Sequence, residues 1–153
     1  MHVLELKVPP VGVVLVAAAL MWVASGTVPA LEFTLPACDV VAALFAAAGL
    51  AVGVMGIVSF ARAKTTVNPM KPGAASSLVV SGIYRYSRNP MYLGLLLLLL
   101  GWAWYLSNAL AFLLLPGFIL YMNRFQIEPE ERALASLFGE AFTAYRARVR
   151  RWL

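Results

Sequence analysis

Four apolar stretches without a single charged residue constrain what this chain can fold into. They run from Val11 to Val23, from Val40 to Phe60, from Pro90 to Leu106 and from Ala109 to Met122. Stretches of this kind approach the roughly 17–25 residues that a helix needs to cross a bilayer. A backbone in lipid must satisfy its own hydrogen bonds, and the absence of period-two alternation argues against a barrel. We therefore expect an all-α polytopic membrane protein with four transmembrane helices.

The composition supports a membrane protein. Of the 153 residues, 62% are hydrophobic and 12% are charged. Soluble domains contain about 45–50% apolar and about 25% charged residues. The polar remainder is too short for a Rossmann-type domain.

The first apolar stretch has two interpretations. Its basic flank is weak, since Lys7 stands beside Glu5, and Ala24-Ser25-Gly26 resembles a signal-peptidase site. However, the run is long and a second span follows soon after it. We expect a retained helix rather than a cleaved signal peptide.

The positive charges indicate an orientation. All 12 Lys and Arg residues lie before the first stretch, between the second and third, or after the fourth. Residues 24–39 contain the acids Glu32 and Asp39 and no basic residue. The positive-inside rule predicts that both termini and residues 62–89 face the cytoplasm from the inner membrane. The net charge of +5 then favours contact with anionic membrane lipids, and without a nucleic-acid motif we expect no nucleic-acid partner.

The short connection Ser107-Asn108 predicts a tight turn between the third and fourth helices. Such a hairpin makes neighbours of the segments at its open end, since packed helices lie about 8–10 Å apart. One segment is basic and aromatic, from Gly82 to Gly94, and the other is acidic, around Glu130 and Glu131. We expect the two segments to form a pocket suited to a zwitterionic cofactor.

Asn89-Pro90 is typical of a helix start, with Asn as the N-cap and Pro in the first turn. The positive end of that helix would suit a carboxylate or phosphate near Arg85 and Arg88. Taken alone, the same pattern also fits a capped helix with snorkelling arginines.

The C-terminal region has an amphipathic pattern. Pro129 predicts a break after the fourth span, followed by a helix on the cytoplasmic membrane surface with a kink at Gly139. Its apolar positions are Leu134, Leu137, Phe138, Ala141, Phe142, Tyr145, Val149 and Trp152. A helix of this type can also serve only as a terminal anchor.

Three further features carry less weight. Gly49 and Gly53 form a GxxxG pattern, which serves helix packing within a monomer or between copies. The segment 61–81 is turn-rich, and a connection of that length is either functional or a plain linker. Cys38 and His2 are the only residues of their types, so we expect no zinc site.

The second half of the chain resembles the isoprenylcysteine carboxyl methyltransferases, related to phospholipid N-methyltransferases, in their bacterial integral-membrane form. The resemblance covers about Thr65 to Leu153. Residues 1–64 form a separate N-terminal region that we expect to contain two membrane helices. It is carried by Leu78-Val79, Gly82-Ile83-Tyr84, Arg88-Asn89-Pro90-Met91-Tyr92-Leu93-Gly94, Glu130-Glu131-Arg132-Ala133-Leu134 and Phe138-Gly139.

The resemblance implies a methyltransferase core that uses S-adenosylmethionine. The implied cofactor-binding residues are Ser76, Ser77, Leu78, Val79, Tyr84, Asn89, Pro90, Met91, Tyr92, Glu130 and Glu131. The implied catalytic residues are Arg88, Asn89 and Arg124.

Two departures bear on the methyl acceptor. Asn89 stands where isoprenylcysteine enzymes typically have His, and Gln126 stands where they have a substrate-side arginine, for which Arg124 is the nearest alternative. The acceptor therefore stays open among a prenylcysteine-like carboxylate, a phospholipid amine and a small thiol. A different class also fits the pattern, namely a non-enzymatic membrane assembly or lipid-binding protein. The oligomeric state is not indicated.

Overall fold

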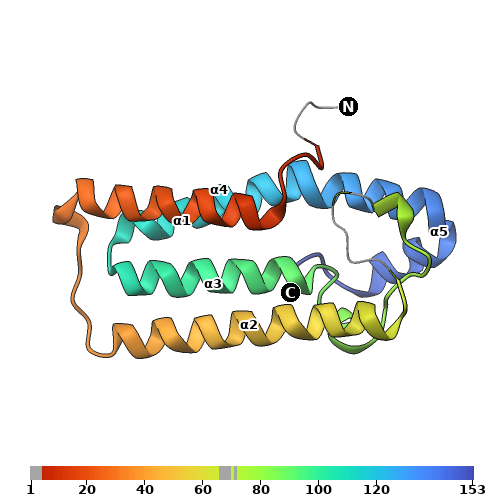
Figure 1. Ribbon diagram of the computed structural model, residues 1–153, viewed down its shortest axis with the longest axis horizontal. Helices are drawn as coiled ribbons and strands as arrows, with labels where there is room; N and C mark the ends of the chain where they lie inside the picture. Colours follow the sequence, from red (N-terminus) through yellow and green to blue (C-terminus); the bar gives the residue numbers. More distant parts are fainter. Residues whose placement is uncertain (1–4, 66–69, 71) are drawn as a thin grey trace.

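Four apolar helices lie side by side, and a bent fifth helix closes one end of the bundle (Figure 1). The computed structural model describes residues 5–65, 70 and 72–153. The elements are α1 (Pro10–Thr27), η1 (Pro29–Leu31), α2 (Cys38–Arg62), η2 (Pro72–Ala74), η3 (Gly82–Arg85), α3 (Pro90–Leu106), α4 (Ala109–Tyr121), η4 (Met122–Ile127) and α5 (Glu128–Arg148). Within the described residues the regular structure is helical, with one isolated bridge between Glu32 and Asn108.

Length and hydropathy make three of these helices candidates for membrane spans. They are α1, α2 and a continuous helix from Ala109 to Arg148 that contains α4 at its apolar start. α3 is equally apolar but has only 17 residues. The expected helices at all four apolar stretches are confirmed.

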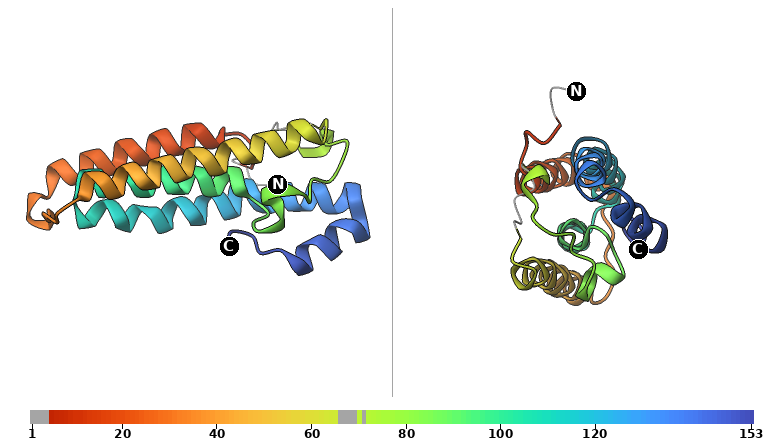
Figure 2. Two further views of the ribbon diagram at one scale, coloured as in Figure 1. Left: turned by 90° about the horizontal axis from the view of Figure 1, so that it is seen from below. Right: turned by 90° about the vertical axis from the view of Figure 1, so that its right-hand side faces the viewer.

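α3 is the central helix, and α2 packs along it through glycines (Figure 2). A Cβ atom added to Gly94 would lie 2.6 Å from the carbonyl oxygen of Gly49 and 2.9 Å from the amide nitrogen of Gly53. Likewise, a Cβ atom on Gly101 would lie 2.8 Å from the carbonyl oxygen of Ala42. The GxxxG pattern is thus occupied by packing inside the monomer, where small residues let two backbones approach closely.

The turn at Ser107-Asn108 is confirmed, and Asn108 holds two helix ends together. Ser107 adopts a left-handed conformation with φ 48°, which ends α3. The fully buried Asn108 accepts a hydrogen bond from the Leu110 N–H at 2.9 Å and caps α4. Its amide also donates to the Val28 carbonyl at 3.0 Å, which satisfies an acceptor just beyond the end of α1.

An α-helix begins beside Pro129 as expected, with Glu128, Glu130 and Glu131 in its first turn, but the expected break is wrong, because the chain stays helical from Ala109 to Arg148. A proline inside a helix removes one backbone donor and crowds the carbonyl four residues earlier, which here belongs to Phe125. The π-helical turn η4 occupies that stretch, and the Phe125 carbonyl accepts instead from the Leu6 N–H at 3.1 Å. The helix therefore continues past Pro129, because the turn is wider and the N-terminal segment donates a hydrogen bond to the Phe125 carbonyl.

α5 bends sharply at Gly139, as expected, since this residue has φ 49° and ψ −121°. The second half of the helix folds back toward the start of α3, and the C-terminus lies there (Figures 1 and 2). Phe142 and Tyr145 of the apolar stripe are consequently buried against the protein. The stripe continues past the helix, because α5 ends at Arg148, before Val149 and Trp152.

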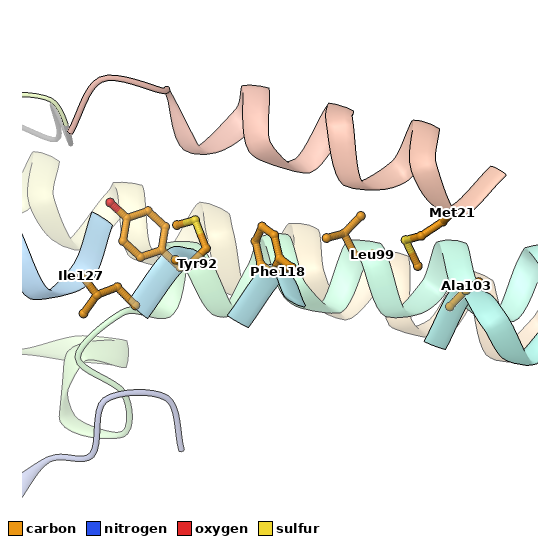
Figure 3. Close-up of a cluster of buried hydrophobic side chains, with 8 residues drawn as sticks. Met21, Tyr92, Leu99, Ala103, Phe118 and Ile127 are labelled. Carbon is orange, nitrogen blue, oxygen red and sulfur yellow. The ribbon is translucent and has the colours of Figure 1, made fainter. Parts of the chain in front are cut away.

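The core forms a row along the bundle axis between α1, α3 and α4 (Figure 3). Met21, Leu99, Ala103 and Phe118 fill its interior, and Tyr92 with Ile127 ends it beside α5. The core thereby runs directly into the region where the two polar segments meet.

We predict that Gly94→Ala destabilises the protein, because its new methyl group would meet backbone atoms of α2 that cannot turn aside. The free energy of unfolding should fall by about 1–3 kcal/mol, the usual cost of overpacking a tight contact. Thermal unfolding in detergent measures this change.

Gly117→Ala is the matched control, since no heavy atom lies within 4 Å of a Cβ atom there. Alanine favours helix by up to about 1 kcal/mol over glycine, so this variant should unfold at the same or a higher temperature. Equal destabilisation of the two variants would contradict the close α2–α3 contact.

Candidate functional site

The two polar segments do meet, and an ion pair joins them. Arg88 precedes α3 and donates from Nη2 to Glu131 Oε1 of α5 at 2.8 Å. The two side chains are only 10% and 11% exposed, so the ion pair is largely withdrawn from water. Arg151 donates to the same carboxylate, from Nη2 to Oε2 at 2.8 Å and from Nε to Oε1 at 3.2 Å. Glu131 is therefore held by two guanidinium groups.

Glu130, the neighbouring carboxylate, has a different environment. Its Oε1 accepts a short hydrogen bond from the Tyr92 hydroxyl and another from Gln126 Nε2 at 2.6 Å. Both donors are uncharged groups, and Gln126 is brought to this position by the π-helical turn. Helix geometry gives the two adjacent acids different surroundings, because successive side chains of a helix point in different directions.

The start of α3 is confirmed at Pro90, but Asn89 does not cap it through its side chain. Instead, Asn89 Nδ2 donates to the Arg151 carbonyl at 2.9 Å. The buried Ser87 takes part in the turn, and its Oγ accepts from the Asn89 N–H at 3.1 Å. Asn89 thus occupies the N-cap position as expected, but its side chain bonds to the returning C-terminal chain instead of to the helix.

Aromatic side chains from three elements surround the space next to these polar groups. Tyr84 of η3 is buried and packs edge-on against Phe60 of α2, with ring centroids 5.4 Å apart. Tyr145 of α5 donates from its hydroxyl to the Tyr84 carbonyl at 2.8 Å. Burial raises the pKa of the Tyr84 phenol well above its usual range, so this group stays neutral at physiological pH.

The segment 75–79 forms another wall. Ser77 Oγ donates to the Ala63 carbonyl at 3.2 Å, and the Ser76 N–H donates to Thr65 Oγ1 at 3.0 Å, which tie this segment to the end of α2. Val79 is buried. The turn residues Thr66, Asn68 and Pro69, like His2, lie outside the described residues.

These walls enclose a cavity of about 90 Å³, within an outward-opening space of about 660 Å³. The lining residues are Phe60, Ala75, Ser77, Leu78, Val79, Tyr84, Arg88, Asn89, Met91, Tyr92, Glu130, Glu131, Leu134, Phe142 and Tyr145. Most of the residues expected at a cofactor site are therefore brought together here.

Three of the expected residues lie outside the lining. Ser76 is exposed, and Pro90 is buried at the start of α3. Arg124 is 41% exposed and lies within 3.4 Å of both Glu5 and Glu128. The guanidinium of Arg124 is thus directed to the N-terminal segment and to the first turn of α5.

Sequence reasoning missed several lining residues, namely Phe60, Ala75, Leu134, Phe142 and Tyr145. Phe142 and Tyr145 belong to an apolar stripe that was assigned to the membrane surface. The kink at Gly139 was the available signal, because a bend there can turn the stripe toward the protein. Nothing in the sequence indicated that Arg151 would reach Glu131.

Comparisons with known proteins identify a family whose model covers most of the chain. The model of the phospholipid methyltransferase family matches residues 38–141. An uncharacterized protein of Haemophilus influenzae is 52% identical over 63 residues, which are 41% of this chain and 100% of that protein. A protein-S-isoprenylcysteine O-methyltransferase of Schizosaccharomyces pombe is 39% identical over 72 residues, which are 47% of this chain but 30% of that enzyme. No solved structure matches the chain significantly.

Proposed function

The chain belongs to the phospholipid methyltransferase family, a membrane methyltransferase family, and we propose that it transfers a methyl group from S-adenosylmethionine to a lipophilic acceptor. The proposed site is the cavity between the start of α3 and α5. The observation that carries the proposal is the junction of Arg88 and Tyr92 with Glu131 and Glu130 at one cavity.

Arg88 offers a group suited to the cofactor's carboxylate. Its Nη1 and Nη2 are occupied by the Val149 carbonyl and by Glu131, but its buried Nε has no partner among the described residues. A buried N–H donor without an acceptor costs about 1–3 kcal/mol. A carboxylate in the cavity would supply the missing acceptor, and a charge-assisted bond of this kind is among the stronger hydrogen bonds.

Glu130 suits the cationic and hydroxyl-bearing parts of the same cofactor. Neutral donors hold its carboxyl group, whereas guanidinium groups hold that of Glu131. Burial raises the pKa of Glu130 to about 7, so a cationic group bound beside it would favour its ionised form. An amino group or ribose hydroxyl could therefore bind to it. The rings of Phe60, Tyr84 and Phe142 offer faces for an adenine ring and for the positive sulfonium.

Bound S-adenosylmethionine would supply an electrophilic methyl group on a sulfonium. The acceptor's lone pair would form the new bond to that carbon, and the electron pair of the broken carbon–sulfur bond would stay on sulfur. The protein's part is to align the two reactants and exclude water. Asn89 cannot act as a base, and its amide donates to the Arg151 carbonyl, so it positions backbone at this site.

Carboxylate, thiolate and neutral amine acceptors can all attack without a strong base. A prenylcysteine-like carboxylate, a phospholipid amine and a small thiol therefore remain the candidate acceptors. A thiol or ammonium must first lose a proton, which solvent at the open side of the cavity can take.

A non-enzymatic assembly or lipid-binding role is the competing proposal. Part of its sequence support was the GxxxG pattern, but a Cβ atom on Gly49 would lie 2.7 Å from the Gly94 carbonyl oxygen of α3 within the monomer. Close packing inside the monomer therefore already accounts for Gly49. The methyltransferase proposal also accounts for the charged residues Arg88, Glu130 and Glu131 that line the cavity.

We further propose four membrane spans, with both termini and the cavity on the cytoplasmic side and α5 at the membrane surface. The open end of the hairpin carries the arginines, while the opposite loops contain Glu32 and Asp39 and no basic residue. α3, with 17 residues, meets the lower limit of about 17 for a span.

We predict that purified protein in detergent binds S-adenosylmethionine and that Glu130→Ala weakens the binding at least tenfold. The loss follows from removing the carboxyl group that would contact the cofactor's amino group or ribose. Isothermal titration calorimetry measures the dissociation constant, with Glu140→Ala as the control because Glu140 is an exposed acid on the same helix.

Membranes that contain the protein should transfer radiolabelled methyl groups to a product whose identification names the acceptor. Folded wild-type protein that binds no S-adenosylmethionine would overturn the proposed function. Equal weakening by Glu140→Ala would remove Glu130 from the site.

The orientation predicts the behaviour of reporter fusions. A green fluorescent protein fused after Leu153 should fluoresce, because it would fold in the cytoplasm. Alkaline phosphatase fused after Phe33 should be active, because it would be exported. A dark C-terminal fusion with normal expression would contradict the proposed topology.

A further inference from the structure

The C-terminal tail, residues Val149–Leu153, binds the segment that starts α3. The Arg88 N–H donates to the Arg150 carbonyl at 3.0 Å, and Arg88 Nη1 donates to the Val149 carbonyl at 2.7 Å. Asn89 Nδ2 donates to the Arg151 carbonyl at 2.9 Å. Three successive carbonyls of the tail are thus taken by two residues of the cavity wall.

The tail is also fixed beyond Arg151. Trp152 Nε1 donates to Asn123 Oδ1 of the π-helical turn at 3.0 Å, and its ring packs against the core. The backbone of Arg151 is therefore held from both sides, which determines where its side chain begins.

The Arg151 side chain uses this fixed position to hold Glu131. Its Nη2 and Nε contact separate carboxylate oxygens at 2.8 and 3.2 Å, the paired geometry that favours arginine over lysine. Arg88 donates only to Oε1 of Glu131, whereas Oε2 accepts from Arg151 alone among the described residues. Oε1 accepts from both guanidinium groups.

We propose that Arg151 is a positioning residue of the cofactor site, acting through Glu131 and Arg88. By occupying Oε2, it confines Arg88 to a contact through Nη2 and keeps Nε of Arg88 free for a ligand. Arg88 Nη1 would stay held by the Arg146 and Val149 carbonyls without Arg151, but the released Glu131 carboxylate could rotate onto Nε of Arg88, which has no partner in the described part of the chain, and take the place of a ligand. This inference rests on the proposed function, since the ligand is S-adenosylmethionine.

A purely structural tail would give a different result. In that case Arg151 would only fasten the C-terminus, and its loss would lower thermal stability without a selective effect on ligand binding. The two roles are separable, because the backbone contacts of the tail do not depend on the side chain at this position.

The test compares Arg151→Gln, Arg151→Lys and Arg150→Gln as full-length proteins in detergent. Calorimetry gives the dissociation constant for S-adenosylmethionine, and ligand-free thermal unfolding reports on the fold. Arg150→Gln is the matched control, since it removes the same charge one residue away from an exposed side chain whose carbonyl contact remains.

We expect Arg151→Gln to weaken binding at least tenfold and Arg150→Gln to change it by less than about twofold. Arg151→Lys should fall between wild type and Arg151→Gln, because an ammonium group restores the charge but not the paired contact. Unfolding temperatures of the ligand-free proteins should stay within a few degrees of each other.

Two results would overturn the inference while leaving the proposed function intact. One is wild-type affinity in Arg151→Gln, and the other is equal weakening by Arg150→Gln, which would indicate a general effect of charge. Should Arg151→Gln fail to fold, wild-type affinity in Arg151→Lys would overturn the inference, and weakened binding would support it. Failure of the wild-type protein to bind would instead overturn the proposed function itself.

Discussion

The ion pair between Arg88 and Glu131 joins the start of α3 to α5, and the cavity exists because these two elements are held together. Removing two charges from water is unfavourable. The attraction within an ion pair offsets this desolvation free energy only when its geometry is good and further hydrogen bonds are present. Here Arg151 adds a second guanidinium, and backbone carbonyls of the tail accept from Arg88. These additional hydrogen bonds hold the ion pair at the end of the bundle where α3 begins.

The adjacent acids Glu130 and Glu131 have different partners in this arrangement. Glu131 is paired with two guanidinium groups and connects segments, whereas Glu130 receives its hydrogen bonds from the neutral Tyr92 and Gln126 and lines the cavity. Gln126 belongs to the π-helical turn, and π-helical turns of this kind are frequent at functional sites. Glu131 thus joins the two segments, and Glu130 is the acid that we propose as a ligand contact.

Much of this architecture could be predicted from sequence. Uninterrupted apolar runs define the helices, and Ser107-Asn108 leaves room only for a tight turn, which forces the polar segments together. The path through Pro129 could not be predicted, because it depends on a distant partner, the Leu6 N–H, for the Phe125 carbonyl. The side chain of Asn89 was assigned to the helix cap for the same reason, since only the folded chain brings the Arg151 carbonyl within its reach.

We propose that the junction before α3 and the two halves of α5 form one binding site. Photolabelling with a photoreactive analogue of S-adenosylmethionine, followed by mass spectrometry of the peptides, tests this proposal directly. We expect label in residues 75–92 and in residues 128–145 of the same protein, removed by an excess of unlabelled S-adenosylmethionine. Label that is absent from both segments, or that resists competition, would contradict it.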